Sequence, residues 1–162
     1  MKRAVCVVAA LLMITVSGAF AQESGSGRYA TNVMSTDSND LPSGGSVDVV
    51  HYHQVTFADE IGHPLDNNMA DCVGMYRFSA DGAVVSASGT CFSTDADGDG
   101  SSFWWRLNEQ GTSDCPGMCG VWGYYAGYGK FDGISGAGEW QQTTTFPDGS
   151  GSGTWKGTYS LK

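Results

Sequence analysis

The chain has 162 residues, of which 8 are Lys or Arg and 17 are Asp or Glu, giving a net charge of −9. This acidic balance argues against partners such as nucleic acid or an anionic membrane surface, because both select basic patches. Aromatic residues make up 12% of the chain, which excludes a disordered low-complexity protein despite its 24 glycines.

Residues 1–21 have the features of a secretory signal peptide. Lys2 and Arg3 form a basic start, an apolar run extends over residues 4–16, and Ala19-Phe20-Ala21 provides a small-x-small cleavage site. The apolar run is shorter than the ~20 residues that a membrane-spanning helix needs. We therefore expect cleavage after Ala21.

The mature chain is then a single domain over residues 22–162. Without Lys2 and Arg3 it keeps 6 basic residues against 17 acidic ones, a net charge of −11. Four cysteines remain after cleavage, and an even set in an exported domain is typical of disulfides. These features predict a secreted or periplasmic protein.

The rest of the chain is predicted to form strands and almost no helix, because apolar and polar residues alternate and glycines interrupt nearly every candidate helix. Residues 22–27 and 35–45 are expected to be a Gly/Ser-rich leader and a polar loop. Eight antiparallel strands with short turns predict an all-β fold, an up-and-down β-barrel or a sandwich. The expected strands are 28–34, 46–58, 71–79, 83–94, 101–108, 119–126, 132–146 and 152–161.

Two hairpins carry register predictions. Asp81-Gly82 suits a two-residue type I′ turn, which places Cys72 directly opposite Cys91. That position is a wide, hydrogen-bonded pair unless a bulge intervenes. In the last hairpin, a four-residue turn over 147–150 places Trp140 opposite Gly157 and Tyr159 opposite Gly138, so that rings meet small residues inside a curved barrel.

The cysteines allow three connectivities, and the hairpin favours Cys72–Cys91 together with Cys115–Cys119. A four-sulfur zinc site is the alternative. It requires two close pairs of cysteines, and Cys72 and Cys91 are not close in sequence.

Three glycine-rich stretches carry a resemblance to a known family. They are residues 89–99, residues 127–136, which read Gly-x-Gly-Lys-Phe-x-Gly-Ile-x-Gly, and residues 153–159. Their order and spacing resemble small exported bacterial proteins similar to the allene oxide cyclase barrel, a calycin-like architecture to which dirigent proteins are more distantly related. The resemblance implies an eight-stranded barrel with an apolar pocket and assigns no catalytic residue.

Asp95, Asp97 and Asp99 are spaced like the first ligands of an EF-hand calcium loop. Position 12 of that loop is Arg106 in place of glutamate, and the flanking residues alternate as a strand. We therefore expect a hairpin tip whose aspartates bond to local backbone groups, with a calcium site as the alternative.

His51 and His53 lie on the odd-numbered face of 46–58, together with Val47, Val49 and Val55. This face is more apolar than the even-numbered one, so it is expected to point inward. The two imidazoles then serve as ligand contacts, as an acid–base pair, or as a hydrogen-bonded polar patch, and a metal site is a further alternative.

The ligand-binding residues predicted for the barrel interior are His51, His53, Trp140, Trp155 and Tyr159. Aromatic rings of this kind stack on apolar or cyclic molecules. The leading hypothesis is an exported barrel that binds a small apolar or cyclic ligand without a cofactor. The alternatives are a cyclase or isomerase that uses His51 or His53 as acid or base, and a structural or surface-interaction protein with a packed interior.

Overall fold

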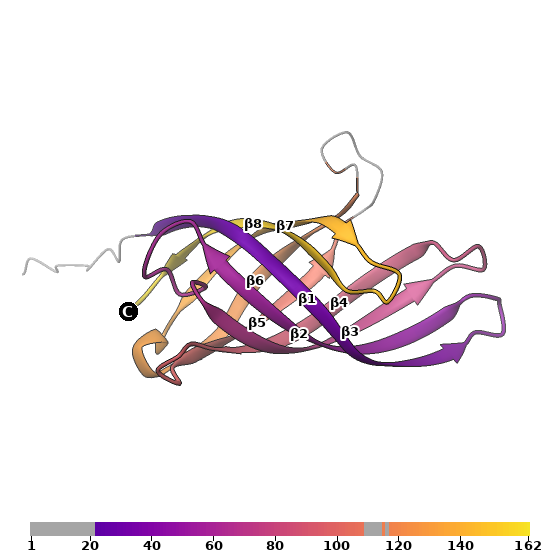
Figure 1. Ribbon diagram of the computed structural model, residues 1–162, viewed down its shortest axis with the longest axis horizontal. Coiled ribbons are helices and arrows are strands. Elements are labelled where there is room, and N and C mark those ends of the chain that lie inside the picture. The colour runs from indigo at the N-terminus through magenta and orange to yellow at the C-terminus, as the bar shows by residue number, and fades with distance from the viewer. Residues whose placement is uncertain (1–21, 109–114, 116) are drawn as a thin grey trace, which may run out of the picture.

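The computed structural model describes residues 22–108, 115 and 117–162. The predicted signal peptide therefore lies outside the described residues. The described chain is a closed barrel of eight antiparallel strands in which each strand pairs with the next and β8 returns to β1 (Figure 1). The strands are β1 (Glu23–Asp40), β2 (Ser46–Ala58), β3 (Asn68–Phe78), β4 (Val84–Thr94), β5 (Gly100–Leu107), β6 (Met118–Tyr128), β7 (Ser135–Thr145) and β8 (Gly151–Ser160).

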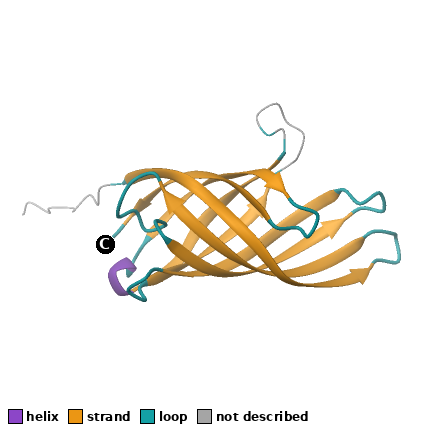
Figure 2. Cartoon of the chain, in the orientation of Figure 1, coloured by secondary structure: helices purple, strands orange, loops and turns teal. Residues whose placement is uncertain are grey.

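This architecture confirms the predicted up-and-down barrel. A single 3₁₀ turn, η1 (Gly129–Phe131), is the helical element of the described residues (Figure 2). No helix in this part of the chain is both long and apolar enough to cross a membrane.

β1 is much longer than expected, because it includes the supposed leader from Glu23 and most of the supposed polar loop as far as Asp40. Its residues 23–31 pair with β8, and its residues 27–40 pair with β2. Polar side chains are tolerated in β1 because alternate residues of a barrel strand point outward into solvent. The β1–β2 and β3–β4 hairpins project beyond the rest of the barrel at one end (Figure 1).

Four hairpins share one turn, a three-residue loop that ends in a left-handed glycine. In the β3–β4 turn, Ser79 N–H donates to the Ala83 carbonyl, and Gly82 has φ 81°. The predicted two-residue type I′ turn is therefore wrong. The three-residue loop with a left-handed glycine is the next most common hairpin connection, and its Asp-Gly sequence also suits it. The other three loops have their left-handed glycines at Gly44, Gly98 and Gly149.

The Cys72–Cys91 disulfide is confirmed, with the two Cα atoms 4.1 Å apart across the β3–β4 ladder. A register shift between Arg77 and Phe78 separates this pair from the turn. The shift supplies the bulge that the sequence required and turns the wide pair position into a close one. The Cys115–Cys119 disulfide is also confirmed, at the start of β6.

The register predicted for the last hairpin is wrong. Trp140 lies opposite Trp155, while Gly138 faces Gly157 and Gly136 faces Tyr159. The turn has three residues in place of four, and a further shift between Gln142 and Thr144 displaces the pairing. The residues of the turn could not predict this bulge, because it lies within β7.

One end of the barrel is filled. Residues 59–67, which connect β2 to β3, place the buried side chains of His63 and Leu65 under the strands. Phe131 of η1 and Ile134 are buried at the same end. The opposite end carries the β1–β2, β3–β4 and β7–β8 turns, and the space between its strands is not filled by side chains.

Candidate functional site

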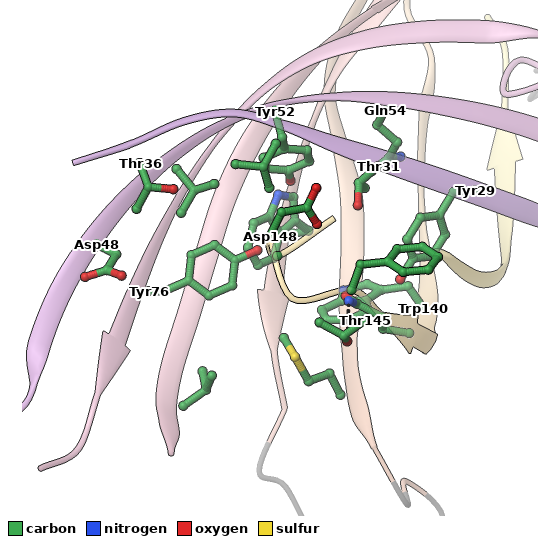
Figure 3. A pocket seen from close by; sticks show the side chains of 18 of the residues that line it. Tyr29, Thr31, Thr36, Asp48, Tyr52, Gln54, Tyr76, Trp140, Thr145 and Asp148 are labelled. Atoms are coloured by element: carbon green, nitrogen blue, oxygen red, sulfur yellow. Dashed lines mark hydrogen bonds between the residues drawn. The ribbon is translucent and has the colours of Figure 1, made fainter. Parts of the chain in front are cut away.

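The barrel contains a cavity of about 450 Å³ that extends from its middle to the end with the β7–β8 turn. This volume lies within the range of small-molecule pockets. Side chains from all eight strands line it, with β4 contributing Val84 at its first residue (Figure 3). The aromatic members of the lining are Tyr29, Tyr52, Tyr76, Phe78, Phe103, Trp105, Trp122, Trp140, Phe146 and Trp155.

The indoles lie flat against glycines of the barrel wall. A Cβ atom on Gly89 would come within 2.6 Å of Trp105, and one on Gly120 would come within 2.5 Å of Trp140. Both glycines are therefore required for close approach, as the sequence predicted in general terms. Because the rings follow the wall, they leave the centre of the barrel open.

The rings hold one another by edge-to-face packing. The ring centroids of Trp105 and Trp140 are 6.0 Å apart with an angle of 88° between the planes, and those of Trp122 and Trp155 are 6.1 Å apart at 86°. Edge-to-face pairs at this separation are favourable beyond their buried area. These contacts fix the rings against the cavity wall.

Polar groups line the cavity at more than one depth, with Gln54 and Thr56 toward the filled end and Asp48 and Asp148 at the mouth. Figure 3 shows Tyr52, Tyr76 and Asp148 pointing into it from β2, β3 and the β7–β8 turn. Burial raises the pKa of Tyr76 to about 12 and raises the pKa of Tyr52 well above its ordinary value. Both phenols therefore stay protonated near neutral pH and act as hydrogen-bond donors. Asp48 also lines the mouth, beside its cross-strand neighbour Tyr76.

The β7–β8 turn bends over this mouth and is fixed to β1. Ser150 Oγ accepts a hydrogen bond from Val33 N–H at 3.0 Å, and Thr31 Oγ1 accepts one from Gly151 N–H at 3.0 Å. Asp148 Oδ1 accepts the Ser150 N–H at 2.9 Å within the turn. These bonds hold Asp148 at the rim.

The inward orientation predicted for His51 and His53 is wrong. Both side chains are exposed on the outer face, whereas Tyr52 is only 7% exposed. His53 Nε2 lies 3.0 Å from Asp71 Oδ1, an ion pair on the outside of the β2–β3 ladder when the imidazole is protonated. The outer surface of β2, β3 and β4 is itself apolar, so hydrophobicity did not distinguish the two faces. Its exposed apolar side chains are Phe57, Met69, Val73, Met75, Val85 and Phe92.

The other three predicted ligand-binding residues are buried or half-buried inside the barrel but do not form one group. Trp140 and Trp155 line the cavity. Tyr159 lies at the filled end, where its hydroxyl donates to Glu23 Oε2 at 2.5 Å. Burial, followed by this carboxylate, raises the pKa of Tyr159 to about 12.

His63, which the sequence left in a loop, belongs to the filled end. Its ring centroid is 4.6 Å from that of Tyr159 and 4.9 Å from that of Trp155. Its Nδ1 accepts the Leu65 N–H at 3.0 Å. Burial lowers the pKa of His63, and the nearby carboxylates of Glu60, Asp66 and Glu23 oppose that shift without overcoming it.

The aspartate loop at the β4–β5 turn is organised by local hydrogen bonds and by a lysine. Asp95 Oδ1 accepts the backbone N–H groups of Asp97 and Asp99 at 2.9 and 3.1 Å. The Lys130 ammonium lies 2.5 Å from Asp95 Oδ2 and 3.1 Å from Asp97 Oδ2. Hydrogen bonds from Lys130 lower the pKa of Asp95. The structure thus supports the hairpin-tip interpretation, since an ammonium holds the position that a calcium ion would need.

Sequence reasoning missed the residues that line the mouth, Asp48, Tyr52, Tyr76 and Asp148. The signal for the first two was present in the even-numbered face of 46–58, which carries Val50 and Gln54 as well. Within residues 22–108, 115 and 117–162, no group of three or more His, Cys, Asp or Glu side chains is arranged to hold a metal ion.

The fold is similar to that of a dirigent protein. A solved structure of a pterocarpan synthase dirigent protein matches 97% of this chain and 100% of its own, with a TM-score of 0.53 and 14% sequence identity. At this identity the likeness concerns the fold. No family model matches the chain, and no curated protein matches it either.

Proposed function

We propose that this protein is an exported barrel that binds a small apolar or ring-containing molecule in its lumen. The observation that carries the proposal is the cavity of about 450 Å³, which is open at one end and has aromatic rings on its walls. Ligand sites are typically cavities of this size with an apolar lining and a few polar groups. Tyr52, Tyr76 and Gln54 supply those polar groups here.

Two further observations agree with this proposal. The two disulfides indicate an oxidising environment such as the cell exterior or the periplasm. A dirigent protein that is named a pterocarpan synthase has the same barrel fold. The name suggests that this architecture can hold a multi-ring compound.

The two alternatives receive less support. A packed structural barrel would have no internal cavity of this size. The cyclase or isomerase hypothesis relied on His51 and His53 as acid or base, and both side chains lie on the outer face. Binding is therefore the function that the geometry supports best.

Titration with a neutral ring compound tests this proposal. We expect isothermal titration calorimetry to detect binding of 2-naphthylmethanol to the purified protein. Val50→Trp places an indole inside the cavity and should weaken binding by roughly 10-fold or more. Thr36→Trp at the rim provides a second occluding variant if the first unfolds, since overpacking also destabilises.

Val73→Trp is the matched control, because Val73 is exposed on the outer face of β3. It adds the same indole without narrowing the lumen, and we expect its affinity to equal that of the unmodified protein. If Val73→Trp weakens binding while Val50→Trp does not, the probe binds to the outer surface and the proposal fails.

A further inference from the structure

The charges that face the lumen all have one sign. Asp48 and Asp148 line its mouth, and none of the described lysines, arginines or histidines lines it. Every lysine and arginine in the described part of the chain is exposed. Residues 109–114 and 116, which are outside that part, contain no basic residue. Neither the described residues nor residues 109–114 and 116 therefore supply a basic side chain that could neutralise an anion in the lumen.

Among the described residues, each of the two carboxylates has one hydrogen-bond donor, and that donor is neutral. Asp48 Oδ1 accepts the Ser38 hydroxyl at 2.6 Å, and Asp148 Oδ1 accepts the backbone N–H of Ser150 at 2.9 Å. Among the ion pairs of the described residues, neither aspartate has a cationic partner. The second oxygen of each carboxylate has no donor among the described side chains and can accept from a ligand.

The aromatic walls favour the same sign of ligand. The faces of aromatic rings carry negative potential and attract ammonium groups, most strongly for tryptophan. Trp105, Trp140 and Tyr76 all line the space into which the mouth opens. Asp48, Tyr76 and Asp148 line the same space and are labelled in Figure 3. An aromatic surface next to two carboxylates matches a molecule with a ring and a positive charge.

We propose that the physiological ligand is a ring-containing amine or quaternary ammonium compound, an inference that rests on the proposed lumen function. Its ring packs against Trp105 and Trp140, and its cationic group lies at the mouth beside Asp48 and Asp148. Ring compounds that carry a carboxylate are rejected, because two carboxylates at the entrance repel them and nothing in the lumen pairs with them.

Three probes that share a naphthyl ring and differ in charge separate the effect of charge on affinity from the effect of the ring. They are 2-naphthylmethylamine, 2-naphthylmethanol and 2-naphthoate, which are cationic, neutral and anionic at neutral pH. In calorimetric titrations at low salt, we expect the amine to bind roughly 10-fold more tightly than the alcohol, and the naphthoate to bind most weakly. The advantage of the amine should shrink in high salt, because the mouth is open to screening ions.

Asparagine variants test whether Asp48 and Asp148 cause the preference for the amine. Asp48→Asn and Asp148→Asn should each reduce the affinity for the amine by about 3- to 10-fold and leave the affinity for the alcohol unchanged. Asp37→Asn is the matched control, since Asp37 is exposed and pairs with outward-facing Val49 near the same end. It removes the same charge from the outer surface and should leave the order of the three probes unchanged.

The possible failures are distinguishable. If all three probes bind with equal affinity, lumen binding stands and the cation preference is overturned. If Asp37→Asn lowers amine affinity as much as Asp148→Asn does, the effect belongs to the overall charge and the proposed site is overturned. If no probe binds, both this inference and the proposed function fail.

Discussion

The two ends of the barrel are built from the same strands but are closed to different degrees. At the filled end, residues 59–67 and η1 insert His63, Leu65 and Phe131 beneath the strands. At the open end, the β1–β2, β3–β4 and β7–β8 connections are three-residue turns, and Ser150 beside the last of them is buried but small and bonded to the backbone of β1. The β4–β5 connection at the filled end is the same kind of turn, so the two ends differ in the large side chains that residues 59–67 and η1 insert.

The largest expected effect contrasts one phenylalanine from each end. Phe131 is 6% exposed and Phe146 is 55% exposed at the mouth. We expect Phe131→Ala to lower the free energy of unfolding by about 3–5 kcal/mol, because it leaves a void in packed surroundings. Phe146→Ala should lower it by less than about 1 kcal/mol. Equal losses in denaturant titrations would contradict the assignment of a filled end and an open end.

The two disulfides provide a second contrast. Cys72–Cys91 closes a separation of 19 residues in the wall, whereas Cys115–Cys119 closes a separation of 4 at the open end. Loop entropy predicts losses of about 3 and about 2 kcal/mol when each pair is replaced by alanine. Chemical unfolding of the two double variants measures both values. A larger loss of unfolding free energy for the Cys115–Cys119 variant would contradict the loop-entropy prediction and show that the open end depends strongly on this disulfide.

A smaller expected effect is a pH dependence of stability that arises from His63 at the filled end. The pKa of His63 in the folded protein lies below its ordinary value of 6.5, so folding favours the neutral ring. Its stabilising contribution is therefore present above pH 6.5 and is lost as pH falls through the lowered folded pKa. Protonation also removes the lone pair on Nδ1 that accepts the Leu65 N–H. We expect the melting temperature to fall as pH is lowered from neutral into this range.

His63→Asn keeps a hydrogen-bond acceptor without a titrating ring, and it should flatten that decrease. His51→Asn is the matched control, because His51 is exposed on the outer face. It should follow the unmodified protein. Parallel pH profiles for the unmodified protein and His63→Asn would exclude His63 as the titrating group.

Alternation predicted eight antiparallel strands in a barrel or a sandwich, the family resemblance implied the barrel, and cysteine spacing favoured both disulfides. The sequence failed where a single residue of register mattered. The bulge between Gln142 and Thr144 shifted the partner of Trp140, and no turn motif announces it. The face of β2 was misassigned because the outer surface is also apolar, with Phe92 66% exposed on neighbouring β4.

The aromatic part of the site was predicted in part, since Trp140 and Trp155 do line the lumen. The acidic part was not, because Asp48 and Asp148 are distant in sequence and line the same cavity only in the folded barrel. The position of Asp148 depends on hydrogen bonds like that from Val33 N–H to Ser150 Oγ, which have no sequence pattern.

A crystal structure of the protein with bound 2-naphthylmethanol tests the lumen site most directly. We expect the naphthyl ring to lie inside the barrel between Trp105 and Trp140, with its hydroxyl toward Tyr76 at the mouth. A ring bound instead on the outer face among Met69, Met75 and Phe92, with none in the lumen, would contradict this expectation.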